Sequence, residues 1–196
     1  MIFCKILLLV SLVMAYDRKY IESPCPNLKP VTNFNFTAYA SSRWYEIARY
    51  SNDWIGRGDC VYMDHTRDGN RYTFTISDVV NHKLATVGGV VETKFEGDNN
   101  IGHIIYSGDF YKSSENETTF DADVLSIDYD RYCIVHHCKH DNKRKFHHEF
   151  IWILSRTPEL SPDTRNTIDA FLNSTIINQR QLIWDHFSKQ YCDYSK

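Results

Sequence analysis

The 196-residue chain lacks most of the features that would assign it to a membrane-spanning, nucleic-acid-binding or catalytic class. After residue 15, no stretch approaches the roughly 18 consecutive apolar residues that a membrane-spanning helix needs, which argues against membrane insertion. The net charge is only -3 and no basic stripe runs along the chain, so a nucleic-acid partner is not expected. No nucleophile elbow, HExxH helix or paired-carboxylate signature is present. The sequence therefore predicts no enzyme.

The chain also lacks linkers and repeats. Its eight glycines and five prolines form no linker, no low-complexity tract is visible, and no solenoid period recurs. What is present at the start resembles a secretory signal peptide, in which Lys5 supplies the basic region and residues 6–14 the apolar run before the small residue Ala15. We expect a signal peptide over residues 1–15, one domain over residues 16–196, and a secreted, extracellular protein.

Cysteines and glycosylation sequons agree with an extracellular location. Five cysteines remain after the predicted signal peptide, and the simplest count in an oxidising compartment is two disulfides and one free thiol. Four paired cysteines allow three connectivities, and their spacing alone does not choose among them. The five are Cys25, Cys60, Cys133, Cys138 and Cys192. The N-x-[ST] sequons that predict glycosylation are at Asn35, Asn116 and Asn173.

Short segments rich in β-branched and aromatic residues recur along the chain and predict antiparallel strands. The turn at residues 67–70 contains Asp-Gly between two such segments, which favours a hairpin. Regular short strands with tight turns indicate a sandwich or an up-and-down barrel. We expect strands over residues 44–50, 60–66, 71–80, 83–95, 103–112, 118–128, 132–139 and 148–156, and a short last strand over residues 181–185.

One helix is predicted late in the chain. Ser161 can cap it, Pro162 suits its first position, and Asp163 favours the positive end of the helix dipole. Ile168 and Leu172 belong to an apolar stripe at helical spacing. We expect this stripe to pack against the outside of the sheet.

Residues 132–148 contain two cysteines and five of the nine histidines, the densest group of reactive side chains in the chain. Their types alone are compatible with a metal site, a catalytic thiol with its base, or the rim of a binding site. Strand alternation bears on the choice, because neighbouring side chains such as His136 and His137 point to opposite faces of a strand. Alternation therefore argues against a metal site that uses both of these histidines.

Three motifs in order resemble those of the lipocalin family. They are "SSRWYEIARY" over residues 41–50, "SIDYDRY" over residues 126–132 and "ILSRTPEL" over residues 153–160. The resemblance implies an all-β fold, an eight-stranded antiparallel up-and-down barrel with one C-terminal α-helix packed outside. It also implies that Arg156 stacks across Trp44 and closes the barrel floor. Ser42 replaces the family glycine, which puts the start of the first strand in doubt but not the fold.

The segments "CPNLKPVTNFNFTAY" and "FSKQYCDY" are most similar to the insect bilin-binding proteins and insecticyanins, close to apolipoprotein D. This likeness implies the disulfides Cys25–Cys138 and Cys60–Cys192 and leaves Cys133 free. With Cys138 in a disulfide, no cysteine or histidine pair remains in a geometry that zinc favours, so we expect no metal. Relatives of this kind often associate, so a homo-oligomer stays open. With Cys138 facing outward to its partner, alternation turns Cys133 and His137 toward the barrel interior.

The resemblance implies a ligand carrier. We expect a small hydrophobic ligand in the barrel, specifically biliverdin or a related bilin held without a covalent bond, with roles in pigmentation, transport or protection from oxidants. A lipid, sterol or other apolar ligand is the alternative within the class. An isomerase or peroxidase using Cys133 and an interaction protein whose His/Lys loop binds a partner or haem are alternatives of other classes. We expect His137, Lys139 and His148 near the mouth, where they would suit the propionates of a bilin, and Asp78 facing its pyrrole N–H groups. The expected ligand-binding residues are Tyr72, Phe74, Ile76, Asp78, Tyr106, Phe110, Phe120, Val135, His137, Lys139, His148, Phe150 and Trp152.

Overall fold

The computed structural model describes most of the chain beyond residue 23. The described residues are 24–50, 58–96, 99–108, 119–141, 145–185, 187 and 192, without the side chains of residues 93–96 and 99. The expected signal peptide over residues 1–15 and the sequon at Asn116 lie outside these ranges and stay predictions.

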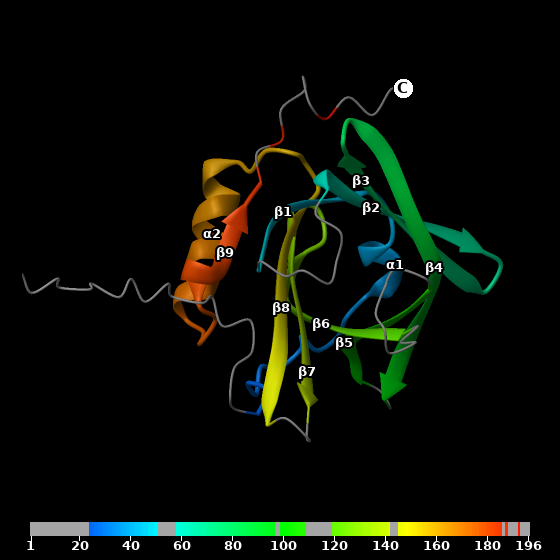
Figure 1. Ribbon diagram of the computed structural model, residues 1–196. Coiled ribbons are helices and arrows are strands. Elements are labelled where there is room, and N and C mark those ends of the chain that lie inside the picture. The colour runs from blue at the N-terminus through cyan, green and yellow to red at the C-terminus, as the bar shows by residue number, and fades with distance from the viewer. Residues whose placement is uncertain are drawn as a thin grey trace, which may run out of the picture.

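Eight antiparallel strands form one sheet that closes into a barrel, which confirms the predicted fold class (Figure 1). The strands are β1 (Trp44–Tyr50), β2 (Asp59–Asp68), β3 (Arg71–Val80), β4 (Lys83–Glu96), β5 (Asn99–Gly108), β6 (Thr119–Asp128), β7 (Tyr132–Asp141) and β8 (Phe146–Ser155). The other elements are α1 (Phe36–Tyr39), α2 (Pro162–Asn173), a short 3-10 helix (Gln179–Gln181) and β9 (Leu182–Trp184). Strands β1 to β8 pair in chain order, and β1 also pairs with β8, which closes the barrel, and with β9.

Local sequence signals account for the hairpin and the helix. At the β2–β3 turn Gly69 has a φ of +59°, a left-handed conformation that glycine adopts without steric cost. Ser161 caps α2, because its hydroxyl accepts a hydrogen bond from the Thr164 N–H at 3.2 Å. Ile168 and Leu172 of α2 are buried against the outer face of the barrel, as predicted. Figure 1 shows α2 and β9 side by side on that flank.

The segment that precedes α1 is tied to β5 and β6. Val31 donates its N–H to the Val124 carbonyl, and the Gly102 N–H donates to the Val31 carbonyl, both at 2.8 Å. A Cβ on Gly102 would lie 2.8 Å from the Val31 side chain, so this approach requires glycine. The helix α1, which the sequence patterns did not predict, is capped by Asn35, whose side-chain oxygen accepts from the Ala38 N–H at 3.0 Å.

Several predicted strand limits are wrong. The structure continues β7 through Asp141 and begins β8 at Phe146, so the loop expected over residues 140–147 is shorter. The reason is that the antiparallel ladder runs on, with His140 opposite His147. Similarly, β5 begins at Asn99 and not at His103, because Asn100 pairs with Phe95 of β4.

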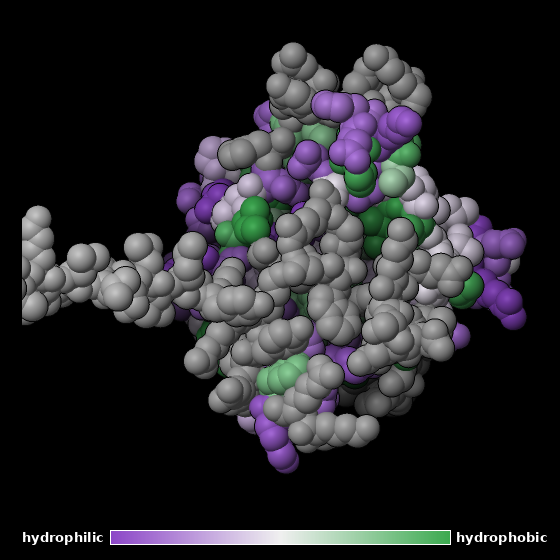
Figure 2. All heavy atoms as spheres, in the orientation of Figure 1, coloured by the Kyte–Doolittle hydropathy of each residue, from purple (hydrophilic) through white to green (hydrophobic). Residues whose placement is uncertain are grey.

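The apolar side chains of the described residues lie mainly inside the barrel and beneath α2. Figure 2 shows the described part of one face as mostly hydrophilic, with separate hydrophobic patches. Among the described residues, no helix is both long and apolar enough to cross a membrane.

Candidate ligand-binding cavity

The barrel contains a cavity of about 180 Å³ with predominantly apolar and aromatic walls. It reaches from Trp44, which is fully buried, to Val87 on β4, which is 40% exposed. The cavity is therefore closed at the Trp44 end and open to solvent beside β4. Its lining residues are Tyr39, Trp44, Glu46, Arg49, Val61, Tyr62, Met63, Phe74, Ile76, Asp78, Val87, Tyr106, Phe120, Ala122, Val135, Trp152 and Leu154.

The closed end is built around Arg156 and Trp44, as the resemblance implies. The Arg156 guanidinium carbon lies 3.5 Å from the centre of the Trp44 ring, a cation–π geometry. The Trp44 indole N–H donates to the Tyr39 carbonyl at 2.9 Å. The same guanidinium donates to backbone carbonyls of α1, of the segment before β1 and of the β6–β7 turn. The acceptors are Ala38, Tyr39, Ser42, Arg43 and Tyr129.

Ser42 does not disturb the start of β1. Its carbonyl accepts a hydrogen bond from Arg156, and its φ is not in the left-handed region. Glycine is therefore not required at this position by backbone conformation, and β1 begins at Trp44 as predicted.

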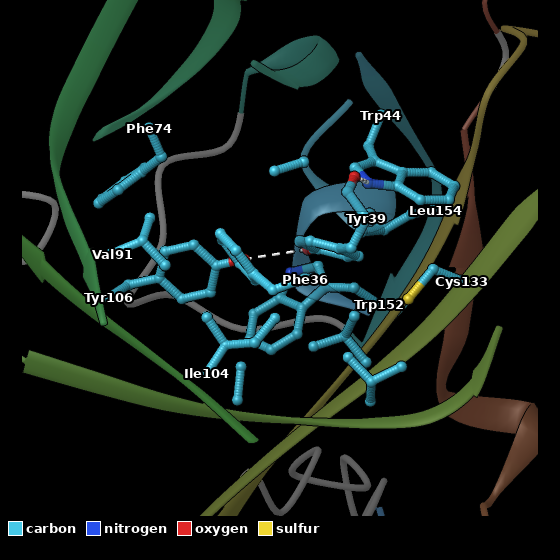
Figure 3. Packing of buried hydrophobic residues seen from close by; sticks show 14 of the residues in the cluster. Phe36, Tyr39, Trp44, Phe74, Val91, Ile104, Tyr106, Cys133, Trp152 and Leu154 are labelled. Atoms are coloured by element: carbon cyan, nitrogen blue, oxygen red, sulfur yellow. Dashed lines mark hydrogen bonds between the residues drawn. The ribbon is translucent and has the colours of Figure 1, made fainter. Parts of the chain in front are cut away.

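Polar groups also lie near the closed end. The hydroxyls of Tyr39 and Tyr106 are hydrogen-bonded at 3.0 Å in a buried position, drawn as a dashed line in Figure 3. The ring of His65 is 5.2 Å from that of Tyr39, and both its nitrogens are buried without a hydrogen-bond partner among the described residues. Burial lowers the pKa of His65 to about 4, with the nearby Arg156 charge acting in the same direction. His65 is therefore neutral at physiological pH.

Seven of the predicted ligand-binding residues meet at the cavity wall. They are Phe74, Ile76, Asp78, Tyr106, Phe120, Val135 and Trp152. Two others pack near it: Tyr72 lies 4.9 Å from the Phe36 ring of α1, and Phe150 stacks on Trp152 with 5.7 Å between ring centres. Phe110 lies outside the described residues.

The three predicted rim residues His137, Lys139 and His148 are not among the lining residues. His137 is held between Phe120 and Phe150, with ring centres 4.2 and 5.6 Å away, and its Nδ1 donates to the Asp121 carbonyl at 2.5 Å. Burial lowers the pKa of His137 to about 4. The ring is therefore neutral at pH 7 and supplies no positive charge for a propionate.

Two charged lining residues were missed from the sequence. Glu46 follows Trp44 at the strand period and is 7% exposed. Arg49 would point outward by strict alternation, but a bulge between Glu46 and Ala48 changes the register of β1. Ala48 is consequently buried in the cluster beneath α2, while Arg49 lines the cavity. Alternation from Trp44 was sufficient to find Glu46, whereas no sequence signal marked the bulge.

The disulfides pair the cysteines as the resemblance implies. Cys25 is bonded to Cys138, and Cys60 to Cys192, across sequence separations of 113 and 132 residues. Cys133 keeps a free thiol, which is fully buried and is not part of the cavity wall. Burial raises the pKa of this thiol, so a nucleophilic thiolate is disfavoured.

The histidine-rich stretch of β7 does not gather into one site. His136 is buried on the outer face, with its Nε2 3.3 Å from Glu149, whereas His137 lies inside. In the part of the chain that the structure describes, no three His, Cys, Asp or Glu side chains are grouped as metal ligands. The central residues of the predicted His/Lys loop, 142–144, lie outside the described ranges.

Known proteins resemble the chain in sequence and in structure. The profile of the lipocalin / cytosolic fatty-acid binding protein family matches residues 41–183. The chain is 30% identical to the bilin-binding protein of Pieris brassicae over 95% of its own length and 96% of that protein, and 27% identical to mouse (Mus musculus) apolipoprotein D over 79% and 77%. The solved structure of insecticyanin from the tobacco hornworm Manduca sexta superposes with a TM-score of 0.79 at 27% identity, covering 90% of this chain and 93% of that one. The chain therefore belongs to the lipocalin / cytosolic fatty-acid binding protein family.

Proposed function

We propose that the protein is a secreted carrier of a small hydrophobic ligand and that this ligand is a bilin such as biliverdin, held without a covalent bond. The observation that carries the proposal is the cavity, which is closed at Trp44, open beside Val87 and lined mainly by apolar side chains. Concave, mostly apolar sites with a few polar groups are typical of small-molecule binding. The likeness to a protein named bilin-binding protein, along 95% of the chain, supports a bilin.

Secretion and a non-enzymatic role have separate support. Two disulfides that join distant segments are typical of proteins from oxidising compartments. The free thiol of Cys133 would have to be exposed and ionised to act as a nucleophile, and burial opposes both. A binding protein is thus favoured over a thiol enzyme.

The size of the cavity favours a second candidate ligand class. At about 180 Å³ it is smaller than the roughly 300–1,000 Å³ typical of ligand pockets. A tetrapyrrole would place only part of its length inside and extend past Val87 into solvent. A smaller apolar molecule, such as a lipid or sterol fragment, would need no such extension.

Titration with biliverdin tests the proposal. Binding in a chiral cavity should induce visible circular dichroism in the pigment, with saturation at one bilin per chain. Ala122→Phe would fill the cavity from its wall, where Ala122 is 1% exposed, and should abolish the signal. Ala170→Phe adds the same ring to the exposed face of α2 and is the matched control. Thermal unfolding establishes that both variants are folded.

Two results would contradict the bilin. The first is an absence of induced dichroism in the wild-type protein, and the second is equal binding by the Ala122→Phe variant. If the neutral fluorescent probe N-phenyl-1-naphthylamine binds the wild-type cavity and biliverdin does not displace it, a smaller apolar molecule replaces the bilin as the proposed ligand.

A further inference from the structure

The charged residues of the cavity lie on one wall. Glu46 and Arg49 come from β1, and Asp78 comes from β3 on the open half of the cavity. All three line a space whose other walls are apolar or aromatic. With every group ionised, these three residues carry two negative charges and one positive charge. We refer to Glu46, Arg49 and Asp78 together as the charged wall.

The positive charge of this wall is already bound. The Arg49 Nη1 lies 2.5 Å from Glu46 Oε1 and 3.6 Å from Asp185 Oδ2, and the Arg49 side chain is only 16% exposed. Asp59 also acts electrostatically on the same guanidinium. Because Arg49 is surrounded by carboxylates, a ligand carboxylate would have to compete with them for the one guanidinium.

Asp78 supplies a carboxylate held in place by the backbone. Its side chain accepts a hydrogen bond from the Gly58 N–H, and a Cβ on Gly58 would lie 2.1 Å from Asp78 Oδ2. Among the described residues Asp78 forms no ion pair. Its carboxylate therefore remains an acceptor on the cavity wall, and burial raises its pKa.

We propose that the charged wall selects apolar ligands whose polar group is a nitrogen that donates hydrogen bonds, a protonated amine above all, and rejects ligands that bring a carboxylate into the cavity. The wall offers acceptors and a net negative charge, and electrostatic interactions are stronger in a partly desolvated cavity than in water. The proposal rests on the proposed function only in requiring that the barrel binds a small apolar molecule. For a bilin it places pyrrole N–H groups, and not propionates, against Asp78 and Glu46.

The ionisation of Glu46 gives the selection a pH dependence. Burial raises the pKa of Glu46 to about 7, while the adjacent Arg49 opposes the shift. The groups that face it are Arg49 on its own strand, Asp185 beyond β9 and Asp78 on β3. Glu46 gains its negative charge as the pH rises through 7, so affinity for an amine should increase between pH 6 and pH 8.

Competition between two ligands with the same alkyl chain tests the proposal. The mature protein is loaded with N-phenyl-1-naphthylamine, and the probe is displaced at pH 8 by dodecylamine or by dodecanoate. Dodecylamine should displace it at a concentration at least about tenfold lower. Ala122→Phe should abolish probe binding, which shows that the competition takes place in the cavity.

Variants of the wall test what each carboxylate contributes to the selection. Asp78→Asn removes an acceptor charge and should reduce the preference for the amine to about threefold. Glu46→Gln removes one negative charge but leaves Arg49 beside Asp185, so it should also reduce the preference for the amine to about threefold. Asp169→Asn makes the same acid-to-amide change on the exposed face of α2 and should leave the ratio unaltered.

Equal or stronger displacement by dodecanoate from the wild-type protein would overturn the proposal, as would an unchanged ratio in both wall variants. A clear amine preference in a protein that does not bind biliverdin would support the charged wall and reject the bilin. A wild-type cavity that takes up no probe, amine or bilin would reject both.

Discussion

Replacing Arg156 by alanine should lower the free energy of unfolding more than replacing any other partly exposed arginine among the described residues. Its guanidinium makes five hydrogen bonds to backbone carbonyls, and it lies 3.5 Å above the Trp44 ring. Because five bonds share three nitrogens and the group is partly exposed, each is assigned about 0.5–1 kcal/mol, and the cation–π contact about 1 kcal/mol. We expect Arg156→Ala to lower the free energy of unfolding by about 4 kcal/mol.

Urea unfolding followed by tryptophan fluorescence measures this loss, with an unchanged m-value as the sign of an intact two-state transition. Arg165→Ala is the matched control, since the Arg165 guanidinium lies 3.7 Å from the Trp184 ring but is exposed and bonded to Asp169. It should cost less than about 1 kcal/mol. Equal losses in the two variants would refute the reasoning, because the carbonyl contacts at the floor would then contribute nothing.

Three further predictions concern buried groups. Cys60→Ser/Cys192→Ser should lower the free energy of unfolding by about 4 kcal/mol in non-reducing urea titrations, since the disulfide closes a long loop; a loss below about 1 kcal/mol would contradict this. Cys133 should resist alkylation by iodoacetamide in the native protein and react only after unfolding, as mass spectrometry would show; ready native labelling would mean that the site opens. His65 has a folded-state pKa of about 4 against an ordinary value of 6.5, so protons bind the unfolded chain first and stability falls as the pH drops from 6.5 toward 4. At pH 5 this contribution is about 2 kcal/mol, and His65→Phe should flatten the pH dependence of urea unfolding by that amount; an identical slope would show that the ring is accessible to protons.

The barrel could be predicted from the sequence because its strands carry strong local signals. Alternation along β3 placed Phe74 and Ile76 on the inner face, and the Asp-Gly pair at Gly69 set the hairpin register. The late helix was marked at its start by Ser161 and along its length by apolar spacing. Each of these features depends on residues close together in the chain, which is why composition and period were sufficient.

Part of the polar lining could not be predicted, because it depends on irregular backbone and on distant neighbours. Arg49 lines the cavity only because β1 has a bulge after Glu46, and a bulge has no reliable signature in a single sequence. His137 lies on the predicted inner face, but packing against Phe120 and Phe150 separates it from the cavity. Alternation predicts the face of the strand on which a side chain lies. It does not predict which other side chains pack against that residue and separate it from the cavity.

The two ends of the cavity have separable roles. At the closed end, the guanidinium of Arg156 is bonded to backbone carbonyls and faces Trp44, so its loss should affect stability. Beyond this closed end, Glu46 and Asp78 are carboxylates on the cavity wall, so their loss should alter which ligand binds. Arg156→Ala should therefore keep the dodecylamine-to-dodecanoate ratio of the wild-type protein under conditions where it stays folded. Asp78→Asn should change that ratio while its free energy of unfolding stays within about 1 kcal/mol of wild type. If the floor variant shifted the ratio as far as the wall variant does, the floor would itself be part of the selective surface, and the division between closure and selection would be wrong.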